Sequence, residues 1–491
     1  MSSATTTLEA PSLSPLGIAR IWVKHLTALY IPAVALLFLC TGPHAWYVAP
    51  FFMVPMALAH QLDCGARRER RQPAPDLPAW PFDGLVYLLA GLQLWVIAET
   101  VRLFSVQAIF SLDMVMVFLI VGGASGFSII TAHELIHRKR RWEQGLGRAL
   151  LCTVLYEHFY TEHLRGHHVR VGTPDDPATA RFGEAYEAFF RRTLPAQLRS
   201  AWRLEKQRLG DADMKLWDRR TLSNRVLHGL VLEWGLALAI FAAFGGTAFF
   251  AFLLQAFVAV RLLEAVNYFE HWGLMRAQRR VRPVDSWDTH SWFTFYGLIG
   301  LSRHADHHAW PARPYQQLRV SEEAPLLPYG YVGMVDLVIG KNDEFQRLAT
   351  QELGRVRLGP FAPGEDRVGA PDPLEPEASL QHLEAVHAQA APRPGRGPWQ
   401  RLPVWLRRSL VLAGVILVAT LGVQWETGAQ QMGFAARLLL HAWVLAAFAG
   451  VLWLRARIEA ASGLETLSWA LAFGLLLVLG RLGDAALPLL G

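Results

Sequence analysis

Nine of the 18 histidines in this 491-residue chain fall into four short clusters. In the first cluster, His133 and His137 are four residues apart and would lie on one face of a helix, where both rings can bind one metal ion. Taken alone, this H-E-x-x-H pattern is typical of a zinc protease with Glu134 as the general base. It suits two histidines at a membrane interface equally well. The other clusters hold seven more histidines: His163, His167, His168, His271, His304, His307 and His308.

The excess of histidines decides between these interpretations. A catalytic zinc site uses three protein ligands, so a protease would need only one residue beyond the first cluster. Nine imidazoles are too many for one zinc ion and suit two metal ions. Neutral imidazole binds iron, zinc, copper and nickel, and the oxidation of strong C–H bonds needs an activated oxygen species that side chains cannot supply. The favoured hypothesis is therefore a pair of irons that acts with oxygen on a lipid-soluble substrate.

Carboxylates accompany the clustered histidines. We expect them to accept hydrogen bonds from the distal ring N–H groups and so to fix the tautomer and orientation of each ligand. A solvated or salt-bridged carboxylate is the alternative for each, and a direct bridging role for one of them stays open. The four residues are Glu134, Glu162, Glu270 and Asp306.

The composition indicates a membrane protein. Hydrophobic residues make up 52% of the chain and charged residues only 18%, whereas a soluble domain carries about 25% charged residues. The net charge of +6 is mild, and no basic stripe or recognition motif suggests a nucleic-acid partner. The three cysteines are too few and too scattered for a disulfide framework or a cysteine-ligated metal module. Residues 1–15 are expected to form a flexible N-terminus without a signal peptide.

Several apolar segments approach the ~20 residues that a membrane helix needs. Arginine and lysine residues follow the second, fourth and sixth of them, so the positive-inside rule places those loops in the cytoplasm. All four histidine clusters then lie on the cytoplasmic side. The expected segments are 21–41, 45–59, 85–104, 115–130, 226–244 and 247–265, followed by 410–425, 435–454 and 464–482.

These observations predict an all-α integral membrane protein. Its core, residues 16–345, would be a membrane-embedded helical bundle with a cytoplasmic histidine-rich site for two irons. Residues 346–405 alternate proline, glycine and charge, which indicates a flexible linker. Residues 406–491 would add a C-terminal membrane appendage of about three helices.

Extended motifs around the histidines resemble those of the membrane alkane 1-monooxygenases, within the membrane fatty-acid desaturase and hydroxylase superfamily. The resemblance covers roughly residues 15–340. The chain departs from the family pattern at Trp272, where tyrosine is usual, and at Ser302 and Ala305 in the last motif. The matching segments are 133–138 (HELIHR), 162–181 (EHLRGHHVRVGTPDDPATAR), 267–274 (NYFEHWGL), 301–319 (LSRHADHHAWPARPYQQLR) and 327–333 (LPYGYVG).

The resemblance implies a six-helix core in which the nine clustered histidines ligate two irons. It implies that O2 is the co-substrate and that the terminal methyl of an alkane or similar alkyl chain, entering from the lipid, becomes a primary alcohol. Electrons would come from a separate rubredoxin served by an NAD(P)H-dependent reductase, with which the lack of a C-x-x-C motif agrees. The location implied is the bacterial inner membrane, with the site facing the cytoplasm. The appendage has no counterpart in the family.

Three other hypotheses stay open. The first is a desaturase, or another enzyme of the same superfamily that oxidises a lipid or an alkyl aromatic. The second is a membrane zinc peptidase that uses His133, Glu134 and His137. The third is a non-catalytic membrane protein that binds or senses metal.

Overall fold

A computed structural model describes residues 14–362, apart from 46–47, 66, 75–76, 110 and 277, together with Gly450 alone in the C-terminal part. Within these residues the chain is helical, and the only β contacts are two isolated bridges, Arg68 with Ser291 and Asp288 with Leu326. The expected appendage, 406–491, and its three membrane segments lie outside the described residues, except for Gly450.

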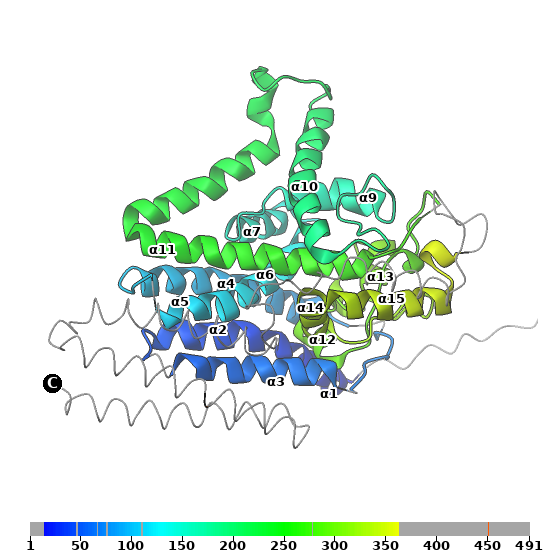
Figure 1. The fold of residues 1–491 in the computed structure, drawn as a ribbon, viewed down its shortest axis with the longest axis horizontal. Coiled ribbons are helices and arrows are strands. Elements are labelled where there is room, and N and C mark those ends of the chain that lie inside the picture. The colour runs from blue at the N-terminus through cyan, green and yellow to red at the C-terminus, as the bar shows by residue number, and fades with distance from the viewer. Residues whose placement is uncertain are drawn as a thin grey trace, which may run out of the picture.

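Long apolar helices run side by side along one axis and form the bundle (Figure 1). Four helical stretches are long and apolar enough to cross a membrane: Pro15–Thr41, Ala79–Phe104, Leu112–Ile136 and Arg225–His271. This length and composition make the chain an integral membrane protein. The helices of the bundle are α1 (Pro15–His25), α2 (Tyr30–Thr41), α3 (Met53–Cys64), α4 (Ala79–Phe104), α5 (Leu112–Met116), α6 (Gly122–Ile136) and α11 (Arg225–His271).

Three of the expected membrane segments do not each correspond to one separate helix. Helix α11 has 47 residues and breaks at Gly245, whose φ of 84° is a conformation that favours glycine. The break falls between the expected segments 226–244 and 247–265. The expected segment 45–59 corresponds to a 3₁₀ turn, Ala49–Phe52, and to α3, which at 12 residues is shorter than a full span.

Two glycines bring α6 and α11 close together. A Cβ atom on Gly122 would lie 2.5 Å from the side chain of Val258, and one on Gly126 would lie 3.2 Å from Leu262 Cδ1. The spacing of four residues puts both glycines on the same face of α6, where small residues let membrane helices approach closely. This contact places the ends of α6 and α11, which carry His133 and His271, next to each other.

The shorter helices gather around one end of the bundle, where α12, α13, α14 and α15 lie (Figure 1). Helix α10 crosses the bundle direction and leads into α11. Helix α15 continues well past residue 345, where the core was expected to end. The bounds are α7 (Arg141–Cys152), α8 (Phe159–Glu162), α9 (His168–Arg170), α10 (Tyr186–Arg208), α12 (Trp292–Gly297), α13 (His304–Ala309), α14 (Tyr331–Gly340) and α15 (Asn342–Val356).

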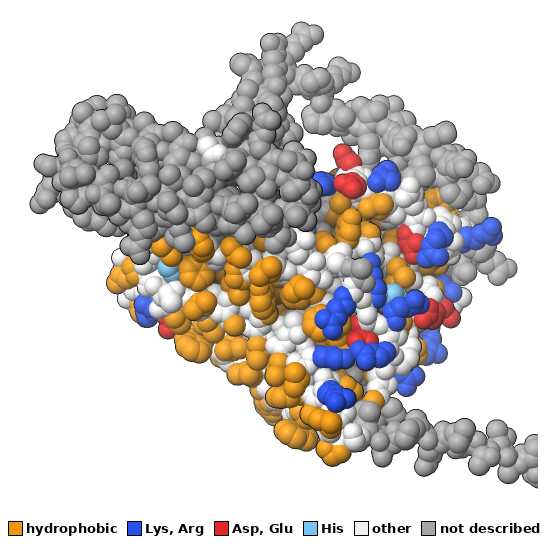
Figure 2. Space-filling model, turned by 90° about the horizontal axis from the view of Figure 1, so that it is seen from below, with side chains coloured by type: hydrophobic (Ala, Val, Ile, Leu, Met, Phe, Trp, Pro, Cys, Tyr) orange, Lys and Arg blue, Asp and Glu red, His pale blue; other side chains and the backbone are white. Residues whose placement is uncertain are grey.

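Charge and apolar surface are separated along the bundle. Figure 2 shows a broad apolar face that gives way to a cluster of lysine and arginine at the end where α13 lies. Exposed apolar side chains such as Trp95, Phe118 and Phe241 fit contact with lipid. The exposed basic residues include Arg67, Arg68, Lys139, Arg140, Arg279 and Arg280, from the loops that were expected to be cytoplasmic.

Candidate metal centre

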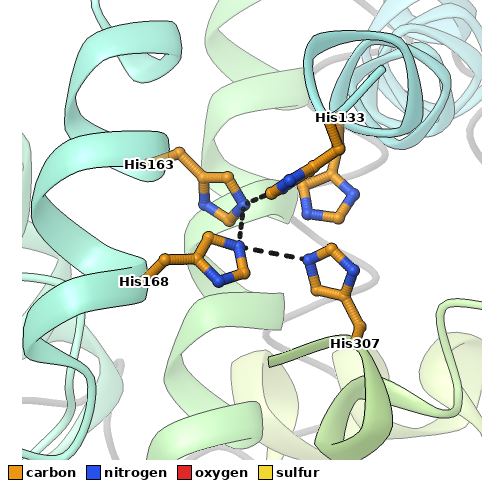
Figure 3. A group of neighbouring side chains, drawn as sticks. His133, His163, His168 and His307 are labelled. Atoms are coloured by element: carbon orange, nitrogen blue, oxygen red, sulfur yellow. Dashed lines mark hydrogen bonds between the residues drawn. The ribbon is translucent and has the colours of Figure 1, made fainter. Parts of the chain in front are cut away.

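Five histidines from three parts of the chain form a first histidine group. One ring nitrogen from each lies within 4.8 Å of the others, in an arrangement that could hold a metal ion. Figure 3 shows rings from different helices turned toward a common centre. The group consists of His133 and His137 from α6 and its C-terminus, His163 and His168 from the segment after α8, and His307 from α13.

Four further histidines form a second histidine group, again with one nitrogen each within 4.8 Å of the others. His271 ends α11, and His304 and His308 are four residues apart on one face of α13. His307, three residues after His304, instead joins the first group. His167 completes the second group. All nine predicted histidines are thus brought together in two adjoining sets.

A π-helical turn explains how one segment serves both groups. Residues His163–His167 form this turn, in which hydrogen bonds join residues five apart. The wider turn aligns His163 with His168, and both point into the first group. His167 lies between them in the sequence and faces the second group. A regular α-helix would instead have aligned His163 with His167.

Seven of the nine histidines are buried, and His137 and His168 are partly buried. His163, His304, His307 and His308 have 3 to 4% of their surface exposed. Burial, reinforced by the neighbouring rings, holds the pKa of each of these four, and that of His168, well below the usual value of 6.5. They are therefore neutral at pH 7, the state in which imidazole binds a metal ion.

The spacing of the ring nitrogens fits metal ligands. A nitrogen ligand lies about 2.0–2.1 Å from zinc, so two ligands at right angles are roughly 3.0 Å apart. Neighbouring Nε2 atoms in the first group are 3.0 to 3.2 Å apart: His163 with His137, His163 with His168, and His168 with His307. In the second group, His304 Nε2 is 3.3 Å from His271 Nε2 and 2.9 Å from His308 Nε2.

Hydrogen bonds between the rings cannot account for all of these short distances between ring nitrogens. A neutral imidazole Nε2 carries either one proton or one lone pair, yet His163 Nε2 and His168 Nε2 each meet two other nitrogens. In addition, His133 Nε2 and His167 Nε2 are buried with no hydrogen-bond partner. Buried polar atoms are rarely left unpaired. Cations at the two groups would satisfy all of these lone pairs at once, so the residues fit a pair of imidazole-bound metal ions.

Three of the four predicted carboxylates are paired with arginine. Glu134 Oε1 lies 2.7 Å from Arg138 Nη2, and Glu162 Oε1 lies 2.6 Å from Arg170 Nη2. Asp306 forms an ion pair with Arg313. Each residue stays next to a histidine in the chain, but its charge is neutralised by a guanidinium group.

Glu270 differs from these three. Its Oε2 atom lies 3.2 Å from His304 Nε2, and its Oε1 atom accepts a 2.5 Å hydrogen bond from the hydroxyl of Tyr331. The side chain is 1% exposed. Among the described residues, no lysine or arginine pairs with it.

Other residues that support the histidines were missed in the sequence. Asp176 Oδ2 lies 2.9 Å from His167 Nδ1 and accepts a 2.6 Å hydrogen bond from Thr179. Asp288 Oδ1 accepts a 2.7 Å bond from the backbone N–H of Ala305 at the start of α13. A signal was present for Asp176, because it follows the second histidine cluster in the Thr-Pro-x-Asp-Pro segment. No spacing rule pointed to Asp288 or Tyr331.

An apolar cavity leads to the histidines from between the helices. Its volume is about 240 Å³. Gly123, Gly126, Phe127, Ile130 and His133 line it along one face of α6, and residues of α11 line the other side. At its polar end it reaches His133, His163, Glu270, His304 and Tyr331. The cavity therefore brings an apolar molecule to the edge of both histidine groups.

Sequence comparisons agree with this arrangement. Residues 111–336 match the fatty acid desaturase family, and this range contains all nine histidines. The chain is 41% identical over 225 residues to alkane 1-monooxygenase 1 of Pseudomonas aeruginosa and 38% identical over 234 residues to the alkane 1-monooxygenase of Acinetobacter baylyi.

These matches cover part of each protein. They span 45 to 46% of this chain and 56 to 58% of the two relatives. A more distant match, 24% identical over 41% of this chain and 54% of the relative, is the hydroxylase component of a xylene/toluene monooxygenase from Pseudomonas putida. Residues 111–336 are therefore similar to the fatty acid desaturase family, and the chain is similar over a comparable length to alkane 1-monooxygenases.

Proposed function

We propose that this protein is a non-haem di-iron monooxygenase of the membrane, which converts the terminal methyl group of an alkane or similar alkyl chain to a primary alcohol. The nine histidines would hold two irons, and O2 would be the co-substrate. One observation carries the proposal: an apolar cavity opens onto two adjoining groups of histidines. Iron bound there supplies the oxidation of a strong C–H bond, which side chains alone cannot perform.

The cavity supplies binding and orientation. Its lining on α6 extends from Gly123 to His133, and ten residues of helix rise span about 15 Å. An extended alkyl chain fits such a narrow apolar space with one end beside His133 and His304. Phe127, Ile130 and Leu262 offer the chain only apolar contacts and keep water away. This arrangement favours reaction at the chain end over reaction along its length.

The names of the relatives support an alkane as the substrate. The likeness to a xylene/toluene monooxygenase component supports a second candidate, an aromatic compound with a methyl group. A zinc peptidase is disfavoured because Glu134, its general base, is paired with Arg138. Five histidines, rather than three ligands, also surround that position.

The remaining assignments belong to the same proposal. The basic loops lie at the end of the bundle that carries the histidines (Figure 2), which favours a site facing the cytoplasm of the bacterial inner membrane. The same arginines would attract an acidic rubredoxin, reduced by its NAD(P)H-dependent reductase. The six-helix core would count α11 as two spans, and residues 406–491 would add a membrane appendage after the linker.

The test uses the full chain in lipid nanodiscs with rubredoxin, its reductase and NADH. We expect about two irons per chain and, under ¹⁸O2, labelled primary alcohols from medium-chain alkanes, identified by gas chromatography and mass spectrometry. Alkyl aromatics and fatty acyl chains are assayed in parallel. A His307→Ala variant should lose iron and product together. One zinc per chain without oxidised product would contradict the proposal.

A further inference from the structure

The four carboxylates beside the histidines fall into two kinds. Glu134, Glu162 and Asp306 are paired with arginines. Glu270 is the exception, because its carboxylate contacts a histidine and a tyrosine hydroxyl. All four carboxylates are next to a predicted metal ligand in the chain, so their position in the sequence does not distinguish Glu270 from the other three.

The carboxylate of Glu270 lies beside one imidazole of the second histidine group. Its Oε2 atom lies 3.2 Å from His304 Nε2. The same nitrogen lies 3.3 Å from His271 Nε2 and 2.9 Å from His308 Nε2. The distance from the carboxylate oxygen to His304 Nε2 is therefore similar to the distances from the same nitrogen to its two neighbouring rings.

The surroundings of Glu270 suit a carboxylate that is bound to a cation. An ionised carboxylate is unfavourable in a buried position unless an opposite charge or a full set of hydrogen bonds compensates for the loss of water. Glu270 is 1% exposed and borders the apolar cavity. The one hydrogen bond from Tyr331 is received by Oε1, which leaves Oε2 directed at the second histidine group.

A buried network holds Tyr331 in place. Its backbone N–H donates a 2.8 Å hydrogen bond to Thr294 Oγ1, and the Thr294 hydroxyl donates a 2.5 Å bond to Asp63. Asp63 also accepts bonds from the backbone N–H groups of Val332 and Gly333, at 2.8 and 3.1 Å, in the first turn of α14. Three helices thus fix the tyrosine that orients Glu270.

We propose that Glu270 is a direct oxygen ligand of the metal ion held by the second histidine group. Each of the two ions then has five protein donors: five imidazoles at the first, and four imidazoles and one carboxylate at the second. The inference rests on the proposed function, since it takes two metal ions for granted. Tyr331 is a positioning residue in this scheme, because it holds the oxygen that does not face the metal.

The test compares Glu270→Gln with Glu134→Gln in the full-length protein in nanodiscs. Both substitutions remove one buried carboxylate beside a metal-ligand histidine, and Gln keeps the size of the side chain. Bound metal is removed from each purified protein, which is then titrated with Fe²⁺ alone. The iron bound per chain and the ⁵⁷Fe Mössbauer spectrum are measured. We expect Glu270→Gln to hold one iron normally and the other at least about tenfold more weakly, with one of two spectral components changed. Glu134→Gln should bind both irons with the same affinity as the wild type and give the same Mössbauer spectrum.

Retention of both irons by Glu270→Gln, with wild-type affinity and spectrum, would overturn the inference, and so would equal weakening of both. If the wild-type protein itself does not bind two irons, the proposed function fails instead. A measurement on the wild type covers the case in which Glu270→Gln does not fold. Fe²⁺ binding should shift one carboxylate stretching band in the infrared difference spectrum, and Glu134→Gln should retain that shift. No shift in the wild type would also overturn the inference.

Discussion

The two histidine groups share a residue type, yet they differ in the charges around them. The first group consists of five imidazoles at the end of the apolar cavity. The second has four imidazoles, with Asp176 behind His167 and Glu270 beside His304. A cation in the first group would meet only neutral donors, whereas a cation in the second would have two carboxylates nearby.

Two groups built from the same type of ligand residue therefore differ in the negative charge that surrounds them. Nearby negative charge favours the more positive state of a group, and by the same reasoning a metal ion bound in the second group would be the more easily oxidised of the two. The first ion, with a neutral shell, is then the easier one to keep reduced. The substitutions below test whether the two groups are distinct, beginning with the largest expected effect.

Removal of one central ring from each group should separate the two sites. His163 contacts two rings of the first group, and His304 contacts two rings of the second. We expect His163→Ala and His304→Ala each to lower bound iron from about two to about one per chain and hydroxylation by at least about 100-fold, because even partners of ligands contribute 10- to 100-fold. Iron content and ⁵⁷Fe Mössbauer spectra provide the measurement.

The two variants act as controls for each other. Their remaining spectral components should differ, one from each group. If both variants leave the same component, or if both lose all iron, the two groups behave as a single site and the comparison fails.

A smaller effect is expected at Asp176, which holds His167 through a 2.9 Å contact. Asp176→Asn removes the negative charge behind this ring and should weaken iron binding in the second group by about 10- to 100-fold. Asp175→Asn is the matched control, since its neighbouring carboxylate is exposed. Competition with a chromophoric chelator gives the affinities. Equal values for the two variants would show that Asp176 does not orient a ligand.

The smallest effect on the metals is expected in the cavity. A Cβ atom on Gly123 would have only Met56 Cε nearby, at 3.8 Å, so Gly123→Leu should fill the far end of the cavity without disturbing either group. We expect unchanged iron content and a severalfold shift of product toward shorter alkanes, measured in competition between chain lengths. A uniform decrease for all chain lengths would indicate general damage instead.

Much of the architecture followed from local patterns. Hydropathy predicted the long helices, and the paired segments 226–244 and 247–265 agree with a helix that breaks at Gly245. Segment 45–59 was less informative, because aromatic residues continue through the turn Ala49–Phe52 and conceal where the helix begins. The expected boundary at residue 345 lies within α15, whose amphipathic sequence has few strongly apolar residues.

The nine histidines could be predicted from their spacing, but their division into groups could not. That division depends on a π-helical turn, which spacing rules for a regular helix do not foresee. The partners of the carboxylates were equally hidden. Tyr331 is 61 residues from Glu270 in the sequence, and only the packing of α14 against the end of α11 brings them together.

The π-helical turn also has a mechanical consequence. His167 and His168 are neighbours in the chain but belong to different groups, and so are His307 and His308. Consecutive Cα atoms are held about 3.8 Å apart by covalent bonds. Two short backbone segments therefore link the groups directly. They would limit how far the separation between two bound metal ions could change when the long helices tilt or slide in the bilayer.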